Sequence, residues 1–392
     1  MQKNLKNKEG LYQCIACLFL GVLSFILFYL LAGRSASDLS IHAAWASEGA
    51  FTNPRSFLHH QVHPLWHLGV GLLLLTGMPL QWAAALATTL WKLLTFWVTW
   101  QLSKSLLGPQ RPAWLATACA LTVSLVSCVC VPWFNPQVYL NVGTPNPWHS
   151  PTQLAVLPFS VVGIRMMAQS YVRFEALGPQ KELFTRRQWL VLAALFALSA
   201  LAKPSFLQAF LPGAALYFLV QWIRHPKGSR YFWQLIAAMV PAVLVVAVQF
   251  YFYFLNPTDT GLMFEFFPNK LWFRTMQLVM MALFPLFALV TDREYRQNRD
   301  PLVTLTILYV LCAWLQTLLL GESGRRAADG NLGWAMMGAA FILWAVMLPR
   351  FVRQQRSGSA GWRSWIGGAA LAWHLLSGLY YIGLLLFTGA AM

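Results

Sequence analysis

The chain carries a succession of long apolar runs, and these constrain its fold more than any other feature. A run of roughly 18 residues or more can cross about 30 Å of hydrocarbon as a helix, and the sequence holds about eleven candidates. They lie near 12–32, 82–103, 112–133, 152–171, 189–202, 205–222, 232–254, 272–291, 301–320, 332–349 and 363–387. Charged residues make up only 10% of the chain, against about 25% in soluble proteins. The sequence therefore predicts an all-α integral membrane protein, with residues 1–392 as a single domain.

Basic residues set the predicted orientation of these spans, because lysine and arginine stay preferentially on the cytoplasmic side. The N-terminus carries Lys3, Lys6 and Lys8 and is placed inside. Alternation of about eleven crossings then puts most other basic loops inside as well. These loops are 104–111, 172–188, 223–231, 292–300 and 350–363. The stretch 63–78 has only about 14 apolar residues and is expected to lie in the outer interface as a helix.

The net charge of +16 follows from this topology and does not indicate nucleic acid, because no basic, aromatic-interleaved soluble module is present to bind it. All six cysteines lie in apolar runs, which favours neither disulfides nor a metal cage. The longest extramembrane piece is the first outer segment, 33–81.

The outer segments collect the unusual polar residues. Six of the eight histidines and half of the acids fall in them. The segments are 33–67, 134–152, 256–270 and 321–331. If the chain has a site, it is expected to face outward.

Asp38 is the most informative acid, since it stands just beyond the first apolar run in "SDLSIHAAWASEGAF". A helix that starts near Ser37 would let Asp38 cap the helix or favour its N-terminus. A positioned carboxylate can instead act as a general base, which contributes roughly 10²–10⁴-fold to a rate. Both interpretations are open from the residues alone.

Four histidines, His59, His60, His63 and His67, cluster in the same segment. His63 and His67 would share one face of a helix, as in metal-binding pairs. No acid accompanies them in the H-E-x-x-H pattern. Contact with lipid headgroups and ligation of a divalent metal therefore both stay open, and no metal ligand is assigned.

The stretch "NVGTPNPWHSPT" contains three prolines and is predicted to be a loop rather than regular helix. Ser150 and Pro151 resemble an N-cap followed by proline at the first helical position. Asn146 and His149 either hold this loop over the next span or line a sugar site.

Several basic residues are candidates for binding a phosphate. Lys203 lies between two half-length helices at a depth where lysine usually pairs or snorkels, and Lys92 lies deeper still. Arg325 and Arg326 break the positive-inside pattern in "GESGRRAADGN", where arginine can bind phosphate with two parallel hydrogen bonds. Glu322 is a candidate site residue in the same loop, either beside a substrate or as an ordinary partner of the arginines.

The order of these features resembles the GT-C superfamily of polytopic glycosyltransferases that use lipid-linked sugars. The likeness rests on "SDLSIHAAWASEGAF", on "HPLWHLGVGLLLLTG" and on the helix break in "ALSALAKPSFLQAFLPG". It covers the first 110 residues best, then 189–215, and the rest by topology. The resemblance implies that Asp38 is the catalytic base or a metal contact. Many members carry two acids together in that loop, whereas Leu39 follows Asp38 here, which weakens a metal requirement.

The expected function is transfer of a sugar, with inversion, from a polyprenyl-phosphate donor to an acceptor hydroxyl of a cell-surface glycan, lipid or protein. Asp38 would deprotonate the acceptor, while Arg325, Arg326 and Lys203 would stabilise the departing phosphate. The expected partners are the polyprenyl-phosphate-linked sugar, the acceptor and membrane lipids. The expected location is a bacterial inner (plasma) membrane, with the site facing outside.

Two other classes compete with this interpretation. A glycan polymerase or ligase usually places its key residues in a large late outer loop, and here that loop has about 11 residues. A transporter or flippase of lipid-linked sugars needs polar groups or broken helices near mid-membrane in related halves, and no repeat is visible.

Overall fold

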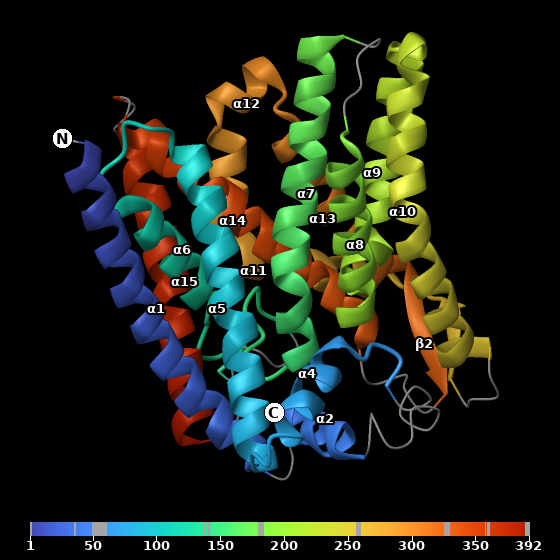
Figure 1. Ribbon diagram of the computed structural model, residues 1–392. Coiled ribbons are helices and arrows are strands. Elements are labelled where there is room, and N and C mark those ends of the chain that lie inside the picture. The colour runs from blue at the N-terminus through green and yellow to red at the C-terminus, as the bar shows by residue number, and fades with distance from the viewer. Residues whose placement is uncertain are drawn as a thin grey trace.

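The computed structural model describes residues 2–34, 37–48, 61–136, 138, 142–178, 184–255, 260–324, 330–356, 358 and 361–388. Within these ranges the chain is an array of helices with a single two-stranded sheet (Figure 1). Eight of the described helices are long and apolar enough to cross a membrane. They are Lys8–Ala32, Pro151–Leu177, Ser205–Arg224, Pro226–Leu255, Pro268–Thr291, Pro301–Leu319, Asn331–Arg356 and Trp362–Phe387. The predicted class, an all-α membrane protein, is confirmed.

The elements follow one another as long helices joined by short connections. The α-helices are α1 (Gln2–Ala32), α2 (Asp38–Ser47), α4 (Leu65–Leu74), α5 (Leu80–Leu107), α6 (Leu115–Leu125), α7 (Pro151–Leu177), α8 (Arg186–Ala202), α9 (Ser205–Arg224), α10 (Ser229–Phe250), α11 (Pro268–Thr291), α12 (Arg293–Asn298), α13 (Pro301–Leu319), α14 (Trp334–Arg356) and α15 (Trp362–Phe387). A π-helical turn, Tyr251–Leu255, extends α10. Figure 1 shows the N-terminus and α12 at one end of the array, and α2, α4 and β2 at the other.

The predicted count of about eleven spans and their orientation stay predictions. The run 112–133 differs most from expectation, because α6 has only 11 residues. Beyond it the chain is extended inside the bundle, where Val129 N–H donates to the Met280 carbonyl at 2.8 Å and Cys130 N–H to Ser377 Oγ at 2.9 Å. Neighbouring helices thus satisfy the backbone, as irregular backbone at this depth requires.

The close approach of this extended segment depends on Gly378 in α15. A Cβ added there would collide with the Leu125 carbonyl. An apolar composition that suits a span therefore also suits a buried strand-like segment, and hydropathy alone does not separate the two.

The short helix α4 lies within the stretch 63–78, which was predicted to form an interfacial helix. With 10 residues it is about 15 Å long, too short to cross hydrocarbon. It packs against α2 and α5, and its placement in the outer interface stays a prediction.

Helix α14 is the centre of the array. In its most apolar stretch, 89% of the residues are buried. The helix packs against α5, α11 and α13. It therefore links the two ends of the molecule, with Trp334 at one end and Arg350 near the other.

The sheet joins segments that are far apart in the sequence. Strand β1 (Thr260–Phe264) pairs antiparallel with β2 (Leu320–Gly324), and Leu262 lies opposite Glu322. This pairing brings the start of α11 beside the segment that precedes α14.

Candidate functional site

Asp38 begins α2 but does not cap it. Ser37 occupies the N-cap, and its Oγ accepts from Ser40 N–H at 2.9 Å. The Oδ1 atom of Asp38 lies 3.5 Å from His42 Nε2. Its Oδ2 is buried and has no hydrogen-bond partner among the described residues. Ser37 thus supplies the cap that was one interpretation of Asp38. The place of Asp38 in the first turn of α2 agrees with the other part of that interpretation, an acid that favours the helix N-terminus.

Histidines from α2 and α4 lie behind this carboxylate. His42 Nδ1 is 2.9 Å from His67 Nε2, and the His63 ring lies 6.3 Å from that of His42. Burial lowers the pKa of His42 to about 3, and the charge of Lys203 contributes in the same direction. His42 is therefore neutral at physiological pH, and its contact with Asp38 is not an ion pair. His59 and His60 lie outside the described residues.

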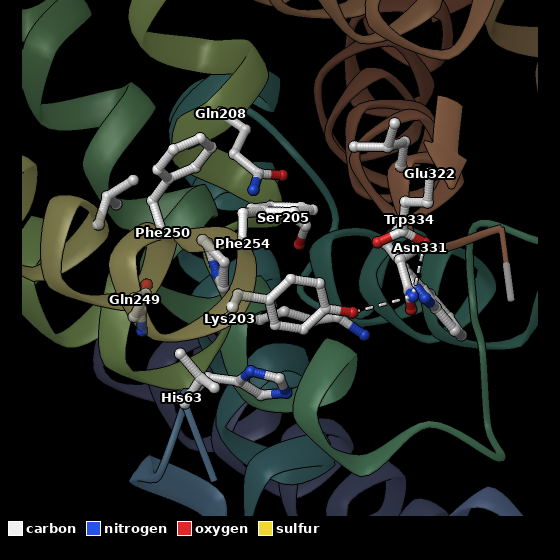
Figure 2. Close-up of a pocket in the computed structure, with 15 residues that line it drawn as sticks. His63, Lys203, Ser205, Gln208, Gln249, Phe250, Phe254, Glu322, Asn331 and Trp334 are labelled. Atoms are coloured by element: carbon white, nitrogen blue, oxygen red, sulfur yellow. Dashed lines mark hydrogen bonds between the residues drawn. The ribbon is translucent and has the colours of Figure 1, made fainter. Parts of the chain in front are cut away.

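Lys203 lines a small pocket of about 100 Å³ between α8, α9, α10 and the start of α14, here named the Lys203 pocket. Figure 2 shows His63, Lys203 and Trp334 around it, with Phe250 on the side away from Trp334. The Nζ of Lys203 lies 3.9 Å from the centre of the Trp334 ring. No carboxylate lies within ion-pair distance of it in the part of the chain that the structure describes.

The charge of Lys203 is coupled to Asp38 across the site. Burial lowers the pKa of Lys203 to about 8, and Asp38 acts against this shift. Asp38 also acts on His149, whose pKa burial lowers to about 4. Asp38, Lys203 and His149 therefore lie within electrostatic reach of one another, although they come from three distant parts of the chain.

Glu322 stands at the rim of the Lys203 pocket. Asn331 Nδ2 donates to Glu322 Oε2 at 2.8 Å and to Tyr253 Oη at 3.1 Å, the two dashed lines of Figure 2. The sequence reasoning missed Asn331, Tyr253 and Trp334. An aromatic and an amide in "GNLGWA", at the entry to a span, were the signal that could have pointed to two of them.

Asn146 and Lys92 hold the loop that carries His149. Lys92 is fully buried, and its Nζ donates to Asn146 Oδ1 at 2.8 Å and to the Ser124 carbonyl at 2.9 Å. Asn146 Nδ2 donates to the carbonyls of Val123 and Val126. These contacts support the loop-holding interpretation of Asn146, which is not among the residues that line the Lys203 pocket.

His149 is buried at the end of the same loop. Its Nδ1 lies 2.9 Å from Tyr381 Oη, and its ring is 5.9 Å from the Trp334 ring. Ser150 and Pro151 occupy the predicted N-cap and first position of α7, although Ser150 makes no side-chain capping bond. His149 thus approaches the site through Trp334.

A second, apolar cavity of about 280 Å³, here named the apolar groove, adjoins the Lys203 pocket. Both are lined by Val62 and Gln249. The rest of the groove is formed by apolar side chains such as Leu201, Leu244 and Phe252. The lining is apolar apart from Gln249, and Lys203 is not part of it.

One predicted feature has no structural description. Arg325 and Arg326 lie outside the described residues. Within the described ranges, no three His, Cys, Asp or Glu side chains come together as metal ligands.

No protein-family model, curated protein or solved structure matches the chain.

Proposed function

We propose that this protein is a membrane glycosyltransferase that moves a sugar from a polyprenyl-phosphate donor to an acceptor hydroxyl at the outer face of the membrane. One observation carries the proposal. Among the described residues, Asp38 Oδ2 has no hydrogen-bond partner and the half-buried ammonium of Lys203 has no carboxylate partner, and the two groups lie within electrostatic reach of each other. A base and a phosphate-binding cation in one small site are the two groups that such a transfer needs.

The reaction requires no further acid. The acceptor oxygen bonds to the anomeric carbon from the face opposite the phosphate, while Asp38 Oδ2 takes the hydroxyl proton. The bond from that carbon to the phosphate oxygen breaks, and its electron pair leaves with the phosphate. Lys203 then stabilises the added negative charge, because its ammonium lies in a site that excludes much of the surrounding water. Arg325 and Arg326 are proposed to share this role.

The surroundings of Lys203 fit an amphipathic donor. The apolar groove adjoins its pocket on one side, so a prenyl chain in the groove would end with its phosphate near the ammonium. A phosphate would also give Lys203 the anionic partner that the described residues do not supply.

Asp38→Asn tests the proposal directly. The change keeps the shape of the side chain but removes its basicity, so transfer should fall by roughly 10²–10⁴-fold. Mass spectrometry of surface glycans and of polyprenyl-phosphate sugars should show a missing sugar and an accumulated donor. The matched control is Glu48→Gln, an exposed acid at the C-terminal end of the same helix, which should behave as the parent.

Unchanged glycans in cells that carry folded Asp38→Asn protein would reject the base assignment. Movement of labelled donor lipid across vesicles without sugar transfer would instead favour a flippase. A product extended by many sugars would favour the polymerase class.

A further inference from the structure

A third cavity, of about 400 Å³, lies between β1, β2 and the first turns of α11, and is here named the hairpin cavity. Glu322, Asn331 and Leu332 line both this cavity and the Lys203 pocket. The 2.8 Å hydrogen bond from Asn331 to Glu322 therefore stands in the wall between them. The Lys203 pocket lies between the apolar groove and the hairpin cavity and borders both.

The described lining of the hairpin cavity is polar, and the charges of its described residues balance. Two carboxylates, Glu265 and Glu322, face two cations, Lys270 and Arg274. Lys270 Nζ is held 2.8 Å from Glu265 Oε2 and also donates to the carbonyl of Leu320 at 3.1 Å. A phosphate would meet two carboxylates here, which disfavours an anion. Hydroxyl groups both donate and accept, so they suit a wall of mixed sign.

Arg274 has a donor that nothing described accepts. Its Nη1 donates to Gln277 Oε1 at 2.8 Å, whereas its Nε is buried without a hydrogen-bond partner among the described residues. A buried donor left unpaired costs about 1–3 kcal/mol. An acceptor oxygen supplied by a ligand in the cavity would remove that cost.

Gly321 of β2 lies against Glu265, on one side of this lining. A Cβ added at Gly321 would collide with the carboxylate of Glu265. A side chain at this position would require the Glu265 carboxylate, and with it the Glu265–Lys270 pair, to shift.

We infer that the hairpin cavity binds the acceptor, and that the acceptor is a neutral polyhydroxyl glycan. Arg274 donates to a sugar oxygen, and Glu322 accepts from a hydroxyl beside the wall of the Lys203 pocket. The lipid donor and the polar acceptor then reach the reaction zone from opposite sides, which keeps the hydrocarbon away from the charged lining. This inference rests on the proposed function.

Binding of glycans to the full chain tests the inference. The probe is the neutral oligosaccharide fraction released from surface glycans of cells that lack the protein, since these glycans have not been modified by it. Native mass spectrometry of the protein in lipid nanodiscs should show a neutral glycan adduct. Arg274→Met should weaken that adduct by about tenfold or more, in line with loss of a charged hydrogen bond. Arg296→Met, an exposed change on α12, should bind as the parent.

A second variant covers the case in which Arg274→Met does not fold. Arg274→Lys keeps the charge but removes the planar donor group, and it should also weaken the adduct. No glycan adduct on the parent, or an undiminished one on a folded Arg274 variant, would overturn the inference. Loss of polyprenyl-phosphate binding in place of glycan binding would overturn it as well, because the cavity would then belong to the donor.

The two proposals fail in different ways. Asp38→Asn should bind the neutral glycan as the parent does while transferring sugar roughly 10²–10⁴-fold more slowly. If Asp38→Asn transfers sugar at the parental rate, the assignment of the base fails, whereas the glycan adduct and its dependence on Arg274 still decide the hairpin cavity.

Discussion

The two ends of the molecule surround a cation in opposite ways. At the end that carries α12, Arg350 Nε and Nη1 each lie 2.7 Å from a carboxylate, those of Asp292 and Asp300. At the other end, Lys203 lies over an aromatic ring and no described carboxylate is close enough to pair with it. A cation surrounded by carboxylates is part of the fold, whereas a cation without one is ready for a substrate anion.

The carboxylates show the same difference. Burial alone would raise the pKa of Asp292, but hydrogen bonds from Arg350 and from the Tyr295 N–H bring it below its ordinary value. Asp292 therefore stabilises the folded state at neutral pH and loses that contribution as the pH falls through its folded pKa. Asp38 has one contact with a neutral histidine, and its Oδ2 has none in the described structure.

The largest effect on stability is expected from Arg350→Met. The change leaves Asp292 buried without its cation, and breaking a buried pair in this way costs about 3–5 kcal/mol. Thermal unfolding of the solubilised protein should shift strongly downward. Arg350→Met combined with Asp292→Asn should recover part of the loss, and a variant as stable as the parent would contradict the structural role.

Lys203→Met should slow transfer strongly and leave thermal stability almost unchanged, the reverse of Arg350→Met. We expect about 10²-fold slower transfer, because the developing charge on the phosphate loses its stabilising cation. Thermal stability should change little, since no described carboxylate is left unpaired. Lys227→Met, at an exposed lysine beyond α9, is the control for loss of one positive charge. A parental rate in folded Lys203→Met protein would remove Lys203 from the phosphate site.

A change at Lys92 tests whether a buried lysine outside the Lys203 pocket also belongs to the site. Its ammonium is satisfied by Asn146 Oδ1 and the Ser124 carbonyl, so Lys92→Met should lower stability by about 1–3 kcal/mol through the unpaired acceptors. The rate of transfer per folded molecule should fall only to the extent that the change displaces His149. Thermal unfolding and the rate per folded molecule, measured side by side, separate the two effects.

The sequence predicted the class of fold and several members of the site for physical reasons that can be named. Hydropathy identifies apolar helices because each must cover about 30 Å, and a lysine beside Pro204 stands out because burial of a charge is costly. The 112–133 segment was mispredicted, because hydropathy does not register that Met280 and Ser377 can satisfy an extended backbone. Trp334 was missed because its contact with Lys203 joins two distant parts of the chain. Arg274 was missed because its place beside β2 depends on the pairing of β1 with β2, a contact between residues about 60 positions apart.

The pH dependence of transfer should give the smallest effect. It tests whether the charge of Lys203 is used for transfer rather than for folding. Burial lowers the pKa of Lys203 to about 8, so its ammonium is present below that pH and is lost above it. Asp38, His42 and His149 interact with its charge, and His63 and Glu322 line the same pocket. Burial lowers the pKa of His42 to about 3 and that of His149 to about 4, so both of these histidines are neutral throughout this range. Transfer should therefore decline as the pH rises through about 8, while Lys203→Arg should abolish this decline because a guanidinium stays protonated. An identical decline in Lys203→Arg would assign the titration to the substrate or to another residue.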